Sequence, residues 1–253
     1  KSTEVLAQAQ RADDTYVYTG PLVMDDLLLR HLSGADPRRI DIGALSKFDS
    51  LKEFFERHRG RKVVYVTFGT QAKPNAPIFE CIRFLIESGM AVVSSAKRED
   101  LPPLAESFDS RQRALYYEAD YLPMHFVCEN ADLMIHHCGS GTYHYPLLHL
   151  LPAITVGTSR YDRDDVAARL EELGASIHLP APEECDDFVG DFKEAARKCL
   201  EESGEFVSAM KRNIASLRAE LERTSASFDF ASVLERAAGL KGRRKNVGRS
   251  NAA

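Results

Sequence analysis

Short apolar runs alternate with amphipathic segments along the middle of this chain. The run 62–68 is rich in β-branched residues and ends at Gly69-Thr70, as a strand buried in a parallel sheet would. Residues 77–87 follow with apolar side chains at helical spacing, and Gly89 stands where that helix would end. Because the alternation continues to residue 179, we predict an α/β fold. It would be a Rossmann-like three-layer arrangement, a parallel sheet with helices on both faces.

The same patterns predict the other elements. Further strands are expected at 90–93, 114–117, 133–135, 153–156 and 176–179, and helices at 126–130, 142–151, 164–173, 188–202, 207–221 and 231–238. Ligands of such sheets bind beyond the carboxyl ends of the strands. Gly69-Thr70, Pro123-Met124 and the turn 137–142 all fall at those ends.

A pair of histidines followed by small residues ends one of the predicted strands, in the run Leu133-Met134-Ile135-His136-His137-Cys138-Gly139-Ser140-Gly141-Thr142. Gly139 and Gly141 would let the backbone approach a ligand without interference from a Cβ atom. A helix opened by Thr142 would direct free N–H groups at an anion. With His137 beside it, this turn predicts a phosphate site, although a lone histidine is more often a satisfied structural residue.

Composition excludes several classes of function. The net charge of −5 provides no basic field for nucleic acid. Five cysteines without a CxxC pair indicate reduced thiols in a cytoplasmic protein, and no apolar run is long enough to span a membrane. We expect no metal site, because adjacent His136 and His137 at a strand end would point to opposite faces. Cys138 is expected to be a small buried residue.

The stretch 114–180 resembles the nucleotide-sugar-binding half of GT-B glycosyltransferases, which include bacterial enzymes that glycosylate natural products and the UDP-glycosyltransferases of plants and animals. The matching pieces are Tyr121-Leu122-Pro123, Ala131-Asp132-Leu133, His137-Cys138-Gly139-Ser140-Gly141-Thr142, Pro152, the strand 153–156, Asp162-Arg163 and the helix 168–174. The run 64–70 is similar to the family's first strand and loop, and 18–22 to its interdomain segment. The likeness covers most of residues 16–238.

This resemblance implies the carboxy-terminal half of a GT-B fold. Residues 1–22 would be an interdomain segment from a missing amino-terminal domain, 23–238 the donor-binding domain, and 239–253 a basic disordered tail. The enzyme would be a glycosyltransferase of the hexosyltransferase class, active only with its amino-terminal acceptor domain or a separate acceptor subunit. It would move a sugar from a UDP- or TDP-sugar to a small-molecule or lipid-like acceptor, with inversion and without a metal or other cofactor.

Site roles carry over to matching residues. The nucleotide base would stack on Tyr121 and meet the backbone at Leu122 and Met124. The diphosphate would be bound by Thr70, His137, Gly139, Ser140, Gly141 and Thr142, and the sugar by Asp162 and Arg163. The acceptor-side catalytic base is expected in the missing domain.

Three departures from the family pattern keep other functions open. Arg163 and Met124 stand where the family has glutamine, and Tyr145 stands where its plant and animal branch has a ribose-binding glutamate. The alternatives are a non-catalytic nucleotide-binding or regulatory subunit that pairs with a separate acceptor-binding chain, and half of a nucleotide-sugar epimerase. The donor sugar, the base, the acceptor, the oligomeric state, and the choice between a fragment and a natural half-enzyme stay open.

Overall fold

The computed structural model describes residues 42–69, 75–95, 104–119, 122–159, 161–201 and 204–226. The chain divides into two compact units, and the described residues up to Arg218 belong to one of them. The sheet, its flanking helices and the candidate site all belong to that unit. The predicted interdomain segment 1–22, the helix 231–238 and the tail 239–253 lie outside the described residues.

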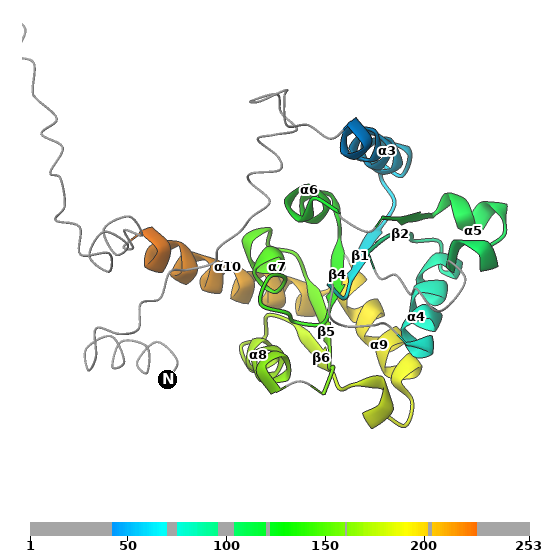
Figure 1. The fold of residues 1–253 in the computed structure, drawn as a ribbon. Helices are drawn as coiled ribbons and strands as arrows, with labels where there is room; N and C mark the ends of the chain where they lie inside the picture. The colour runs from blue at the N-terminus through cyan, green and yellow to red at the C-terminus, as the bar shows by residue number, and fades with distance from the viewer. Residues whose placement is uncertain are drawn as a thin grey trace, which may run out of the picture. The chain divides into compact units, whose positions relative to one another are not determined.

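Strands and helices alternate in the described part of the chain (Figure 1). In chain order they are α3 Ile42–Arg57, β1 Val63–Thr67, α4 Ala76–Glu87, β2 Ala91–Ser94, the 3₁₀ turn η2 Leu104–Ser107, α5 Ser110–Ala114, β3 Tyr116–Glu118, α6 Met124–Asn130, β4 Leu133–His136, α7 His144–Leu148, β5 Ala153–Val156, α8 Tyr161–Glu172, β6 Ile177–Leu179, the 3₁₀ turn η3 Pro182–Glu184, α9 Phe188–Leu200 and α10 Glu205–Ala226.

All six strands run parallel, in the order β3-β2-β1-β4-β5-β6. The predicted parallel α/β fold is therefore confirmed. Strands β2 and β3 follow β1 toward one edge of the sheet, whereas β5 and β6 follow β4 toward the other edge. The strand order therefore reverses between the neighbours β1 and β4. Thr67 at the end of β1 pairs with His136 at the end of β4. Ligands of open parallel sheets bind in the crevice at such a reversal.

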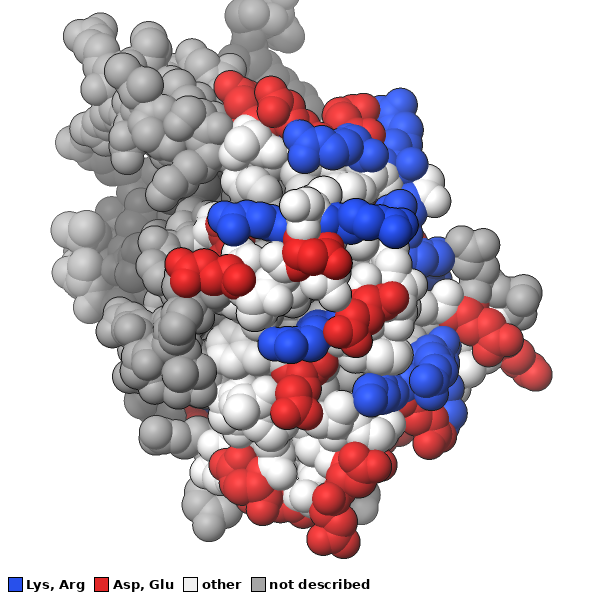
Figure 2. All heavy atoms as spheres, turned by 90° about the vertical axis from the view of Figure 1, so that its right-hand side faces the viewer, with Lys and Arg blue, Asp and Glu red and all other residues white. Residues whose placement is uncertain are grey.

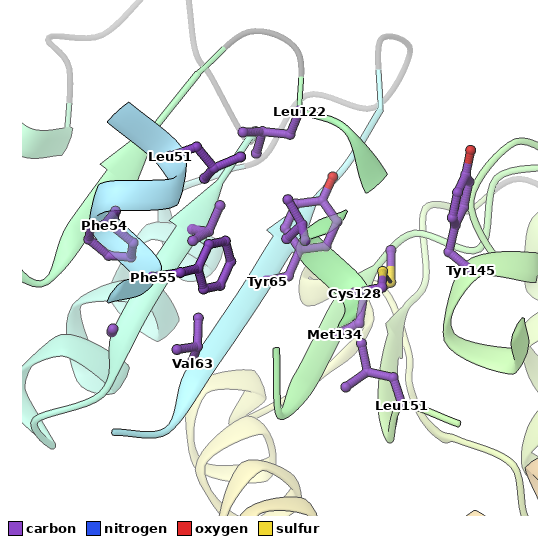
Figure 3. Close-up of a cluster of buried hydrophobic side chains, with 13 residues drawn as sticks. Leu51, Phe54, Phe55, Val63, Tyr65, Leu122, Cys128, Met134, Tyr145 and Leu151 are labelled. Atoms are coloured by element: carbon purple, nitrogen blue, oxygen red, sulfur yellow. Dashed lines mark hydrogen bonds between the residues drawn. The ribbon is translucent and has the colours of Figure 1, made fainter. Parts of the chain in front are cut away.

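Helices cover both faces of the sheet (Figure 1). On one face, Leu51, Phe54 and Phe55 of α3 lie over Val63 and Tyr65 of β1 (Figure 3). Side chains of α6, α7 and β4 complete this cluster, among them Cys128, Tyr145 and Met134. On the other face, α4 packs against β2 and α9, and α9 also packs against β5 and β6. Because both faces are covered, the strands read as apolar runs rather than as alternating ones.

Several predicted boundaries differ from the observed ones. Helix α3 was not predicted, although its buried residues have helical spacing. The strand predicted at 114–117 begins at Tyr116, because Ala114 ends α5, whose start is held by a capping box between Asp109 and Gln112. Helix α8 begins at Tyr161 rather than at 164, which brings two residues of the predicted sugar site into its first turn.

The helix predicted at 142–151 is wrong at its start. The N–H groups of Thr142 and Tyr143 both donate to the carbonyl oxygen of Gly139, at 2.8 and 3.2 Å, and close a turn. Helix α7 begins only at His144 and has five residues. Thr142 therefore opens no helix, and α7 is too short to act as a helix N-terminal anion site.

The surface carries charges of both signs. Figure 2 shows Lys and Arg side chains interspersed with Asp and Glu over the face that it displays. On that face, no basic patch of the kind that nucleic acid requires dominates. No helix within the described ranges combines the length and the apolar character needed to cross a bilayer.

Candidate functional site

His137 lies at the strand-order reversal, in the loop that follows β4. Its ring is held between two glycines: a Cβ atom built on Gly69 would lie 2.9 Å from its Cε1, and one built on Gly139 would lie 2.5 Å from its Nε2. Phe68 stacks on the ring with centroids 6.2 Å apart. Only 4% of His137 is exposed. The loops after β1 and β4 therefore meet around His137. The sequence predicted a site residue in each of these loops, Thr70 and His137, but not the close approach of Gly69 to the histidine.

The turn after His137 presents backbone donors. Among the described residues, no acceptor meets the N–H groups of Gly139, Ser140 and Gly141, whereas Thr142 donates to the Gly139 carbonyl. Successive free N–H groups in a turn form a concave site for anions. The predicted phosphate site therefore has its donors in the turn 139–141 itself. Thr142, 7% exposed, closes that turn with its N–H instead of offering it to a ligand.

His137 is held neutral. Burial lowers its pKa to about 4, and the positive charge of Arg163 contributes to the same shift. The Thr67 backbone opposes the shift, yet Nδ1 of His137 makes no hydrogen bond of normal geometry within the described residues. A buried, neutral imidazole with an unpaired nitrogen can give or accept one hydrogen bond from a ligand. It cannot supply a positive charge at neutral pH.

The residues on either side of His137 shape the loop. His136 is fully buried, its Nδ1 accepts from the N–H of Cys138 at 3.0 Å, and its Nε2 has no partner within the described residues. Cys138 has a φ of 56°, a left-handed conformation that glycine adopts more readily. Its side chain is 2% exposed, and burial raises the pKa of the thiol to about 12. The expectation of a small buried cysteine is confirmed.

The two residues of the predicted sugar site lie in the first turn of α8. Asp162 is exposed and Arg163 is half-buried. Asp164, in the same turn, accepts a hydrogen bond from the N–H of Thr158 at 3.1 Å and holds the helix against the loop after β5. Since β5 pairs with β4, the start of α8 and the His137 loop share one edge of the sheet.

The predicted nucleotide-base residues are only partly described. Tyr121 lies outside the described residues, as does Thr70 of the predicted phosphate site. Leu122 is 4% exposed and belongs to the hydrophobic cluster, against which the partly buried Met124 packs at the start of α6. Their side chains therefore pack in the core, and a contact of their backbone with a nucleotide base stays a prediction of the family resemblance.

Phe68 and Gly69 were not predicted to contact His137. Gly69 has a φ of 61°, so the chain turns back sharply after β1 and passes close to His137. A glycine directly after the predicted buried strand 62–68 was the sequence signal that could have identified Gly69. Within the described residues, no group of three or more His, Cys, Asp or Glu side chains could hold a metal ion.

Part of this chain is similar to known proteins. Residues 116–220 match the family model of the erythromycin biosynthesis protein CIII-like C-terminal domain. This match supports a carboxy-terminal GT-B glycosyltransferase domain over these residues. It is 26% identical over 162 residues to aclacinomycin-T 2-deoxy-L-fucose transferase of Streptomyces galilaeus, covering 64% of this chain and 34% of that protein. It is 30% identical over 148 residues to TDP-daunosamine transferase DnrS of Streptomyces peucetius, covering 58% of this chain and 30% of that protein.

Solved structures share the GT-B fold. Glycosyltransferase VinC, whose structure was solved in complex with DTDP, has a TM-score of 0.54 and 18% identity over 75% of this chain and 44% of its own. The chain spans about a third of the length of the curated relatives that it matches. The comparisons therefore concern the donor-side GT-B domain rather than a whole enzyme.

The buried histidines of this GT-B domain predict acid sensitivity. The pKa values of His136 and His137 are lowered to about 3 and about 4, mainly by burial, from an ordinary value of 6.5. Between pH 6.5 and 4 the unfolded chain binds more protons, so the free energy of unfolding should fall on acidification. Each histidine would contribute up to about 1.4 kcal/mol per pH unit. Urea unfolding from pH 7 to 4.5 should show a shallower fall for His137→Asn than for wild type. Equal slopes would contradict a neutral, buried His137.

Proposed function

We propose that this chain binds a TDP-sugar and that the enzyme to which it belongs transfers the sugar to a small-molecule or lipid-like acceptor. The observation that carries this proposal is the anion site at the strand-order reversal, where free N–H groups of the turn 139–141 lie beside His137. The curated relative named as a TDP-daunosamine transferase favours thymidine over uridine. The amino-terminal acceptor domain or a separate acceptor subunit would complete the enzyme.

The chemistry of glycosyl transfer fits such a site. When the bond between the sugar and the diphosphate breaks, negative charge develops on the leaving nucleotide. Preorganised donors stabilise this charge more strongly than they stabilise the ground state. The N–H groups of Gly139, Ser140 and Gly141 are held by the turn, and His137 is fixed by its neighbours, so little reorganisation is needed during the reaction.

Further parts of the proposal follow from the same arrangement. We propose transfer with inversion and without a metal ion, because a direct displacement needs only donors on the leaving group and a base on the acceptor. Excess EDTA should then leave turnover of the whole enzyme unchanged. Asp162 is proposed to bind sugar hydroxyls. All five cysteines are free thiols, which suits the reducing cytoplasm.

Calorimetric titration with TDP and UDP tests the donor site. Wild type should bind TDP saturably and more tightly than UDP. His137→Ala should weaken TDP binding roughly tenfold, the cost of one hydrogen bond to a charged group. His178→Ala is the matched control, because His178 lies on the edge strand β6 and bonds with Thr155 at 3.0 Å. A folded wild type that binds neither nucleotide would instead favour the regulatory-subunit alternative.

A further inference from the structure

Arg163 lies at the start of α8, directly after the loop that leaves the carboxyl end of β5. The hydrogen bond from Thr158 to Asp164 holds this loop and the first helical turn together. Because β5 pairs with β4, this turn is next to the loop that carries His137. Arg163 therefore lies at the same edge of the sheet as the predicted phosphate site.

Arg163 is half-buried, and no described residue pairs with it. Within the part of the chain that the structure describes, it makes no ion pair or hydrogen bond. Arg169 on the same helix bonds with Glu172 at 2.7 Å. A partly desolvated charge is costly unless an opposite charge is near it. The planar guanidinium matches phosphate oxygens in a bidentate geometry, so an anionic ligand would satisfy it well.

The charge of Arg163 reaches the phosphate site. It is the second cause, after burial, of the lowered pKa of His137, which agrees with the position of Arg163 in the turn next to the His137 loop. The turn itself offers only neutral donors, since His137 is unprotonated at neutral pH and residues 138–143 include no charged side chain. A nucleoside diphosphate carries negative charge and gains more as it leaves. In the turn 137–143 and the first turn of α8, Arg163 is the one described side chain with a permanent positive charge.

We propose that Arg163 binds the β-phosphate of the donor and makes the site selective for a nucleoside diphosphate over a monophosphate. This inference rests on the proposed function, and it gives Arg163 a role different from the sugar contact that the family resemblance implied. The replacement of glutamine by arginine then adds a charge to the leaving-group site. His137, the residue that Gly139 approaches most closely, is 4% exposed and belongs to the loop next to this turn.

The test compares nucleotides that differ by one phosphate. The full chain and its Arg163→Gln, Arg163→Lys and Arg169→Gln variants are titrated with TDP, TMP and TDP-glucose at one fixed salt concentration. If wild type prefers uridine, the uridine series replaces them. Arg163→Gln should weaken TDP binding roughly thirtyfold and TMP binding less than twofold. The TDP affinity of Arg163→Lys should lie between those of wild type and Arg163→Gln, because an ammonium group keeps the charge without the bidentate geometry. Arg169→Gln should match wild type.

Two results would overturn this role while leaving the proposed function in place. Equal weakening of TDP and TMP in both Arg163 variants would indicate a structural effect. Unchanged TDP binding in Arg163→Gln would also overturn it. If that variant then bound TDP-glucose more weakly, the result would support the sugar contact that the resemblance implied for Arg163. A folded wild type that binds neither TDP nor UDP would overturn the inference and the proposed function together.

Discussion

Replacing Gly139 by alanine should weaken TDP binding about a hundredfold or more while the domain stays folded. The new Cβ atom would lie 2.5 Å from Nε2 of His137 and 3.0 Å from Cε1. The ring cannot move aside easily, because Phe68 and Gly69 enclose it. Either the histidine or the turn 139–141 must shift, and both carry phosphate donors. Calorimetric titration with TDP measures the loss, and circular dichroism reports whether the fold is intact.

Gly141→Ala is the matched control in the same turn. No atom of the described residues lies within 4 Å of a Cβ atom built on Gly141, and its φ is not in the left-handed region. The same chemical change should therefore leave TDP binding within about threefold of wild type, which corresponds to less than about 0.7 kcal/mol. If both variants bound TDP like wild type, His137 and the turn 139–141 would not form the diphosphate site.

The sheet could be predicted from the sequence because its strands are buried on both faces. Such strands read as continuous apolar runs, and the run at 133–135 was placed within one residue of β4. Helix α3 also carried a readable signal in Leu51, Phe54 and Phe55. The start of α5 was readable in principle from Asp109 and Gln112, which form the capping box at its N-terminus.

The site could be predicted only in part. The glycine spacing after His137 indicated a phosphate site, and the structure places free donors there. However, local hydrogen bonds decided how the turn folds: the Gly139 carbonyl accepts two N–H groups that a helix starting at Thr142 would have left free. The contact between Gly69 and His137 joins residues far apart in the sequence and arises from the pairing of β1 with β4. No local pattern contains it.

Gly157→Ala should destabilise the domain by about 3 kcal/mol, the upper end of the usual cost of overpacking. Gly157 follows β5, and its N–H donates to the Leu179 carbonyl at 2.8 Å. A Cβ atom there would lie 2.6 Å from the backbone nitrogen of Ala181 and 3.0 Å from the carbonyl carbon of Pro180. Since these are backbone atoms, no side-chain rotation relieves the clash. The denaturation midpoint in urea at neutral pH measures the effect.

Gly60→Ala separates this clash from the general effect of removing a glycine. Gly60 has a φ of 82°, and a Cβ atom on it would meet no atom of the part of the chain that the structure describes within 4 Å. Its cost is backbone strain alone, about 1–2 kcal/mol. Gly157→Ala should unfold at clearly lower urea than Gly60→Ala and should also weaken TDP binding, because the loop after Gly157 carries the first turn of α8. Equal midpoints would mean that the segment 180–181 yields to the methyl group. The approach of Gly157 to the segment 180–181 would then not be needed to hold the start of α8 in place.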